Sequence, residues 1–218
     1  MKLFSYLCAL LLFVYACDQI DELLGGTAAV SIKVPRSMPN KLAKKSNHVI
    51  ITEIKILVDR LKFHSANEDS IDFDQGPFIV VLDSNLTFAQ ISSTTVPAGS
   101  YHKVSFKIHK PDPGEVVADT AFTTGDRYSL IVKGKLDTID FEYKISKTIT
   151  QQIFIDPILT VNDEGSYNAT LFVNTDEWFV DGQNDLDPRE PMDSIKIENN
   201  IKASFRAYKD NNKDGIED

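Results

Sequence analysis

Short runs in which apolar and polar residues alternate follow one another from Thr27 to about Val173. Alternation with a period of two places the apolar side chains of a strand on one face, against a core. Turn residues separate the runs, no strand–helix–strand rhythm is present, and we expect Pro157 to end the strand before it. The clearest runs are 28–34, 78–82, 101–109, 128–136, 139–145, 149–155 and 167–173. We therefore expect a mainly β chain, folded as an antiparallel β-sandwich of about seven to nine strands.

The run of residues 49–63 is long for a strand, and its apolar residues change parity part of the way along. Ile56 and Val58 share one parity, whereas Leu61 and Phe63 share the other. A β-bulge between Val58 and Leu61 would keep all four on one face. An amphipathic helix is the alternative, but β-branched residues at even spacing favour a strand.

The residues from Ser194 to Tyr208 favour one C-terminal α-helix packed on the sandwich. Asp193 or Ser194 can cap its start, and basic residues near its end suit the helix dipole. Apolar residues recur within it at helical spacing, at Ile197, Ile201, Phe205 and Tyr208.

The chain opens with Lys2 and an apolar run that ends at Ala16, directly before Cys17. That run is shorter than the about 20 apolar residues that a spanning helix needs, so we expect a signal peptide. Residues 14–17 resemble the lipobox read by the bacterial lipoprotein signal peptidase, which implies lipidation of Cys17 and anchoring in a membrane. An ordinary signal peptide with a chance cysteine is the alternative. The expected organisation is a signal peptide at 1–16, a lipidated tether at 17–26, a β-sandwich domain at 27–175, and an acidic loop, helix and calcium-like loop at 176–218.

The charge and the cysteine content limit the kinds of partner and cross-link that the chain can have. The chain carries 23 basic and 32 acidic residues, a net charge of −9, and loss of the signal peptide removes one basic residue, Lys2, to leave −10. This excess argues against nucleic acid and fits a body that avoids anionic lipid. Cys8 leaves with the signal peptide and Cys17 carries lipid, so no disulfide is expected. The acidic residues just after Cys17 resemble a surface-export signal of Bacteroidota lipoproteins, and a merely polar tether is the alternative.

The last nine residues, 210–218, have the ligand spacing of an EF-hand-type calcium loop. Oxygen-bearing side chains stand at positions 1, 3, 5 and 9, and Gly215 at position 6 permits the sharp turn. The bidentate glutamate of position 12 is missing. The predicted Ca²⁺ ligands are Asp210, Asn212, Asp214, the carbonyl of Ile216, and Asp218. A frayed acidic tail is the alternative.

Other polar residues give weaker signals. The four histidines form no metal-binding or catalytic motif, and no nucleophile or phosphate-loop motif is present, so we expect no enzyme. We place His102 on the inner face of its strand and His109 on the outer face. A second oxygen-rich cluster comprises Asp181, Gln183, Asp185 and Asp187, for which ordinary turns are the simpler explanation. An acceptor pattern that resembles Bacteroidota O-glycosylation occurs at Ser70, Thr120, Thr138 and Ser194.

The lipobox, the opening strand, Pro97 to Tyr101 and the ending at 197–212 together resemble uncharacterised envelope lipoproteins of the Bacteroidota. The resemblance implies an immunoglobulin- or transthyretin-like β-sandwich held at the outer membrane, periplasmic or surface-exposed, and it implies no activity. We expect a non-catalytic binding, adhesion or accessory module that contacts a protein or glycan and is stabilised by calcium. The alternatives are a secreted hydrolase or inhibitor, and a structural fimbrial or assembly subunit. Four aromatic residues are candidates for glycan stacking, although a core role is expected for each: Tyr101, Tyr167, Trp178 and Phe179.

Overall fold

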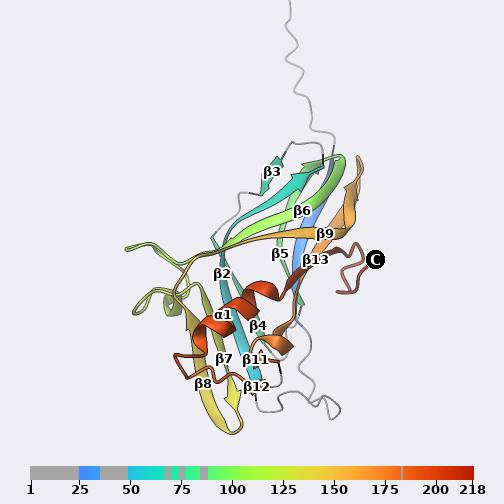
Figure 1. The fold of residues 1–218 in the computed structure, drawn as a ribbon. Coiled ribbons are helices and arrows are strands. Elements are labelled where there is room, and N and C mark those ends of the chain that lie inside the picture. The colour runs from blue at the N-terminus through green and yellow to red at the C-terminus, as the bar shows by residue number, and fades with distance from the viewer. Residues whose placement is uncertain (1–24, 35–48, 67–69, 74–76, 84–87, 183) are drawn as a thin grey trace, which may run out of the picture.

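The computed structural model describes residues 25–34, 49–66, 70–73, 77–83, 88–182 and 184–218 (Figure 1). The predicted signal peptide, Cys17 and most of the tether lie outside the described residues. The strands are β1 Gly25–Lys33, β2 Val49–Ser65, β3 Ser70–Phe73, β4 Phe78–Asp83, β5 Phe88–Pro97, β6 Gly99–Ile108, β7 Leu130–Leu136, β8 Ile139–Ile145, β9 Ile149–Val161, β10 Ser166–Val173, β11 Val180–Asp181, β12 Asn184–Asp185 and β13 Phe205–Lys209. The helices are α1 Ser194–Ala203 and the short 3₁₀ turns η1 Thr120–Phe122 and η2 Thr175–Glu177.

The described residues are mainly β with one α-helix, as predicted, but the main sheet is mixed and curls into a half-barrel. Its strands follow the order β5-β1-β10-β13-β9-β6-β2-β7-β8, with β3 and β4 also paired to β2. The pairs β1–β10 and β13–β9 are parallel, so the prediction of a purely antiparallel sandwich is wrong. Alternation within a strand defines its faces but not its neighbours, and β13 reaches its place only after the chain has passed through α1.

The long strand β2 connects the two halves of the sheet. Its first half pairs with β4 and β7, and its second half pairs with β3 and β6. The pairing with β6 shifts register between Asp59 and Lys62, where Arg60 has a φ of 52°. The predicted bulge is therefore confirmed, and it turns Val58 and Leu61 to the same buried face.

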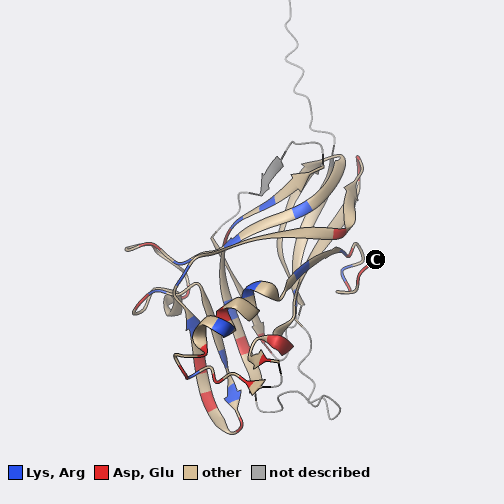
Figure 2. Ribbon diagram, viewed as in Figure 1, with Lys and Arg blue, Asp and Glu red and all other residues tan. Residues whose placement is uncertain are grey.

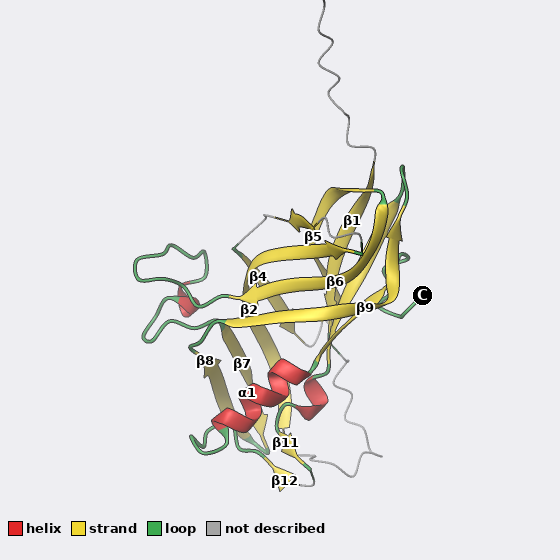
Figure 3. Cartoon of the chain, turned by 45° about the horizontal axis from the view of Figure 1, so that its top comes forward, coloured by secondary structure: helices red, strands yellow, loops and turns green. Residues whose placement is uncertain are grey.

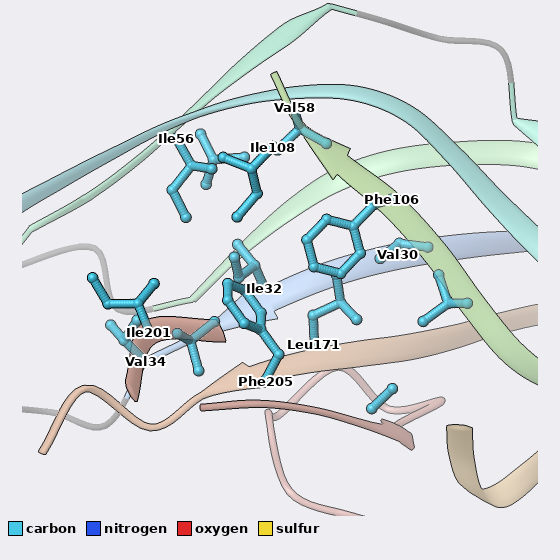
Figure 4. Packing of buried hydrophobic residues seen from close by; sticks show 14 of the residues in the cluster. Val30, Ile32, Val34, Ile56, Val58, Phe106, Ile108, Leu171, Ile201 and Phe205 are labelled. Atoms are coloured by element: carbon cyan, nitrogen blue, oxygen red, sulfur yellow. The ribbon is translucent and has the colours of Figure 1, made fainter. Parts of the chain in front are cut away.

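The core fills the inside of the curl. Figure 4 shows side chains from β1, β2, β6, β10 and β13 pointing toward one another, with Ile201 of α1 at the margin. Burial of one such side chain contributes roughly 1.5–3 kcal/mol, so this cluster supplies the main stabilisation in a body without disulfides. The labelled residues include Val30, Val58, Phe106, Leu171 and Phe205.

The C-terminal helix is shorter than predicted. α1 ends at Ala203, and Phe205 to Lys209 form β13 between β10 and β9. Ile197 and Ile201 are buried on α1 as expected, but Phe205 is buried on a strand. The sequence of residues 205–209 fits a strand, with alternating apolar residues, as well as it fits the apolar stripe of a helix. Pairing with two strands supplies hydrogen-bond partners for its backbone N–H and C=O groups. Asp193, one of the two predicted caps, occupies the N-cap position, but its side chain makes no cap hydrogen bond and accepts from the amide of Asp187 instead.

Hydrogen bonds hold α1 across the space between β8 and β9. Tyr143 of β8 donates to the carbonyl of Ser194 at 3.1 Å, and Gln151 of β9 donates to that of Lys202 at 2.9 Å. Figure 3 shows α1 lying beside β7 and β8 and below β9. The helix thus covers the side that the half-barrel leaves open.

Strand β9 does not end at Pro157, contrary to the prediction, but continues to Val161. Its pairing with β6 shifts register between Tyr101 and Lys103, opposite Phe154 to Leu159. Pro157 lies within this irregular stretch, where its missing N–H leaves no ladder bond unmade.

Gly134 of β7 lies where a side chain has no room. A Cβ there would collide with the carbonyl of Ile50 and lie 2.7 Å from the Phe141 ring. We expect Gly134→Ala to lower the free energy of unfolding by about 1–3 kcal/mol, measured by urea denaturation. Lys135→Ala, on the same strand but at an exposed ion pair, should change it by less than about 0.5 kcal/mol. Equal effects of the two substitutions would contradict the expectation.

Candidate functional site

The C-terminal loop, residues 210–218, folds back onto the sheet rather than fraying. Asp210 is 0% exposed, and the amide of Asp218 donates to the carbonyl of Lys209 at 3.0 Å. Both carboxylate oxygens of Asp210 accept hydrogen bonds, Oδ1 from the amide of Asp214 and Oδ2 from that of Gly215. The loop is therefore closed around the first of the predicted calcium ligands.

A buried chain of polar side chains leads from this loop into the sheet. Thr170 Oγ1 donates to Asp210 Oδ2 at 2.6 Å, and Asn168 Nδ2 donates to Thr170 at 3.1 Å. Ser31 of β1 in turn donates to Asn168 Oδ1 at 2.9 Å. Because buried polar groups are costly unless paired, this chain links the position of the loop to β1 and β10.

The loop also has a negative electrostatic potential. Burial, together with the negative charges of Asp210, Asp214 and Glu217, raises the pKa of Tyr208 to about 12. The hydroxyl of Tyr208 donates to the carbonyl of Gly215 at 2.6 Å, and the ammonium of Lys33 donates to the same oxygen. Negative potential of this kind favours a cation, and Lys33 already supplies one positive charge.

The structure gathers part of the predicted calcium ligand set. The amide of Asp214 lies between Asp210 Oδ1 and Asn212 Oδ1, at 3.1 and 3.0 Å. Asp218 instead accepts from the amide of Asn211, and the side chain of Ile216 is exposed. Within the described ranges, no three His, Cys, Asp or Glu side chains lie close enough together to hold a metal ion. Asp210 and Asn212 thus meet at the amide of Asp214, whereas the carboxylate of Asp218 accepts from the amide of Asn211 instead.

In the second acidic cluster, Asp181 and Asp187 form ion pairs with basic side chains of the same chain. The carboxylate of Asp187 accepts hydrogen bonds from Nε and Nη2 of Arg189 at 2.8 and 2.6 Å. These hydrogen bonds are the main reason that the pKa of Asp187 lies below its usual value. Asp181 pairs with Lys196 at 2.5 Å. Gln183 lies outside the described residues. The cluster behaves as ordinary turns stabilised by ion pairs.

Both strand-borne histidines differ from their predicted places. His109 is buried, and its Nε2 lies 2.8 Å from Glu115, because the chain leaves β6 at Ile108 and folds over it. His102 is only half-buried, since the register shift after Tyr101 turns Tyr101 inward in its place. Its ring centroid lies 6.2 Å from that of Phe154.

An exposed surface on β6 and β9 is the feature that the sequence analysis missed. We call it the β6–β9 face, and it comprises His102, Lys103, Ser105, Lys107, Gln152, Phe154 and Ile158. Phe154 is 70% exposed and Ile158 is 51% exposed. Lys103 lies directly opposite Phe154 in the register, so the two side chains share one side of the sheet. Phe154 has the parity of its polar neighbours Thr150 and Gln152, and this was the available signal in the sequence.

The other aromatic candidates form part of the interior. Tyr101, Trp178 and Phe179 are buried, which confirms the expected core role, and Tyr167 is half-buried against the core. A shallow hollow of about 240 Å³ lies elsewhere, lined by Leu57, Pro77, Phe78, Ile79, Val116, Val117 and Ala118. It is apolar and sits over a small second core around Phe122.

Comparison with known proteins adds little. No family model matches the chain, and no curated protein matches it. MbnP from Methylosinus trichosporium, a solved structure, aligns with 67% of this chain and 75% of its own at 12% identity and a TM-score of 0.37. A match at this level supports no conclusion about function. In the described part of the chain, no helix is long and apolar enough to cross a membrane.

Proposed function

We propose that the protein is a lipid-anchored, non-catalytic module of the bacterial cell envelope that acts by contact through the β6–β9 face. The exposed pair of Phe154 and Ile158 carries this proposal. The two side chains stand four residues apart on β9, and apolar side chains gathered on one exposed face are typical of contact surfaces. The lipobox at Cys17 supplies the location at the outer membrane.

A photo-reactive amino acid placed at Phe154 tests the contact in growing cells. We expect cross-links at this position and far fewer at Ile139, an exposed residue at the start of β8 that serves as the matched control. The same low yield at both positions would contradict a contact role for the β6–β9 face.

The anchor has a separate test. Cys17→Ala should move the protein from the membrane fraction to the soluble envelope fraction and abolish incorporation of labelled palmitate, because a single thioether-linked residue carries the lipid. Cys8→Ala lies inside the predicted signal peptide and is the control, with no expected change. Membrane retention of Cys17→Ala would contradict lipid anchoring.

Calcium is the structural ligand that we propose for the C-terminal loop. The grouping of Asp210, Asn212 and Asp214 and the negative potential at Tyr208 support it. A ligand that binds only the folded state raises stability by about 2.7 kcal/mol at a hundredfold excess over Kd. We expect a higher Tm in excess calcium than in chelator, and loss of the difference in Asp214→Ala. Asp140→Ala, in the β7–β8 hairpin, should keep it, and equal Tm values for the wild-type chain would contradict calcium binding.

One observation favours the structural-subunit alternative. Strand β5 ends the strand order of the main sheet, and its ten residues carry no charge and only one proline, Pro97, at the end. Edges without Lys or internal Pro accept added strands more readily. Concentration-dependent assembly that Ser93→Lys abolishes would support strand addition at this edge.

A further inference from the structure

The start of β1 and the β6–β9 face lie at the same end of the sheet. Gly25 pairs with Pro97 at the end of β5, and β6 begins two residues later at Gly99. Gly99 pairs in turn with Val161, the last residue of β9. The chain that leads from Cys17 therefore enters the fold beside the first residue of β6 and the last residue of β9.

The opposite end of the sheet is marked by the β7–β8 hairpin. Strand β2 runs the whole length, since Val49 pairs with Leu136 next to the hairpin turn and Ser65 pairs with Tyr101 near the start of β6. Ile139, which follows the hairpin turn, thus lies far from the entry of the tether. Figure 1 shows the β7–β8 hairpin and the start of β6 at opposite ends of the molecule.

The length of the tether limits how far Gly25, where the chain enters the sheet, can lie from the membrane that holds the Cys17 lipid. Gly25 follows Cys17 by eight peptide steps, which span at most about 28 Å when fully extended. Ile158 and Phe154 lie three and seven residues before Val161 on β9, or about 10 and 23 Å along the strand. Both side chains are therefore within reach of the bilayer surface that holds the lipid.

The chemistry of the face suits that surface. Phe154 and Ile158 can enter the boundary between headgroups and acyl chains, and Lys103 lies on the same side of the sheet for contact with anionic headgroups. Lys107 lies on this side too and pairs with Asp59 of β2 at 3.7 Å. Figure 2 shows lysine and arginine on the strands of this upper half together with one acidic position on β9, Asp156, whereas charges of both signs occur in the lower half. Because the full chain has a net charge of −9, contact with anionic lipid depends on local lysines such as these.

We propose that the β6–β9 face rests on the anionic bilayer that holds the Cys17 lipid, with Phe154 and Ile158 inserted into its interface. This inference rests on the proposed lipid anchor and names what the face contacts. The second attachment orients the body, so the β7–β8 hairpin and the start of α1 point away from the site of insertion.

Tryptophan fluorescence of the full lipidated protein tests the inference. Phe154→Trp and the control Ile139→Trp are reconstituted in vesicles of phosphatidylethanolamine and phosphatidylglycerol with brominated acyl chains, which quench only fluorophores that enter the bilayer. The native Trp178 is fully buried and supplies a constant background. We expect about twofold loss of the added fluorescence at position 154 and none at position 139. Lys103→Glu with Lys107→Glu should reverse most of the quenching.

The outcomes separate this inference from the proposed function. Flotation of the protein with the vesicles reports the anchor independently of the quenching. Flotation with no quenching at position 154, or with equal quenching at both positions, overturns the bilayer contact and leaves the anchor intact. Protein cross-links at Phe154 in cells together with absent quenching would mean that the face binds a protein partner, which also overturns the inference. Loss of flotation would instead count against the proposed anchor.

Discussion

Trp178→Ala should lower the free energy of unfolding by about 3–5 kcal/mol, the largest effect expected in this chain. Trp178 is 0% exposed and follows η2, where it packs against the main core. Its Nε1 donates to Ser204 Oγ at 2.9 Å, and its carbonyl accepts from Asn200 Nδ2 at 3.2 Å. Removal of the ring leaves a cavity at the point where α1 passes into β13, and the Ser204 hydroxyl loses its donor while it still donates to the carbonyl of Ile201.

Circular dichroism during urea denaturation measures this effect, because the substitution removes the fluorophore. Trp178→Phe is the control, since it keeps an aromatic ring and loses the N–H together with the second ring of the indole. It should cost about 1–2 kcal/mol. A loss below about 1 kcal/mol for Trp178→Ala would mean that the junction between α1 and β13 does not depend on this ring.

Asp210→Ala is expected to lower the free energy of unfolding by about 3 kcal/mol, and to release the C-terminal loop. The substitution leaves the hydroxyl of Thr170 and the amide of Gly215 without their acceptor, and the amide of Asp214 keeps only Asn212 Oδ1. Hydrogen bonds to a charged group are worth about 1.5–3 kcal/mol each, but the loop can hydrate its amides once it opens, so the three do not add. The buried Thr170 and Asn168 bear the remaining cost.

Urea denaturation and amide hydrogen exchange of residues 210–218 measure the two parts of this prediction. Asp218→Ala removes one acceptor from the exposed amide of Asn211 and should cost less than about 1 kcal/mol. Asp210→Asn keeps one acceptor oxygen, so its loss of unfolding free energy should lie between those of Asp210→Ala and Asp218→Ala. If Asp210→Ala and Asp218→Ala had the same effect, the buried chain from Ser31 to Asp210 would not be what docks the loop.

Properties of neighbouring residues were predictable. The parity change between Val58 and Leu61 required a bulge, and the structure has one at Asp59 to Lys62. The turn at Asp137 separates β7 from β8, and the apolar parity of each strand matches its buried face. These features depend on residues a few positions apart, which is the distance over which alternation and turn chemistry act.

The errors have one physical cause. Phe205 to Lys209 fit a helix and a strand equally well, and the neighbours β10 and β9 decided for the strand. His109 is buried by a loop that folds over it, and Pro157 is tolerated because the partner strand is out of register there. In each case the deciding contact came from outside the strand or helix whose pattern was used, either from a distant segment or, for His109, from Glu115 in the loop that follows.

The candidate sites also depend partly on local sequence and partly on contacts between distant segments. The spacing of the C-terminal loop was visible in the sequence, but the burial of Asp210 against Thr170 was not, because β10 and the loop meet only in the fold. Phe154 is an apolar residue at a polar position of its strand, yet its exposure on the same strand as Ile158 depends on how β9 lies against β6. By itself the sequence determined the mainly β composition, the faces of most strands and the predicted anchor at Cys17. Only the tertiary structure decided the mixed strand order, the docking of the C-terminal loop and the β6–β9 face, because each depends on pairing between segments that local patterning does not encode.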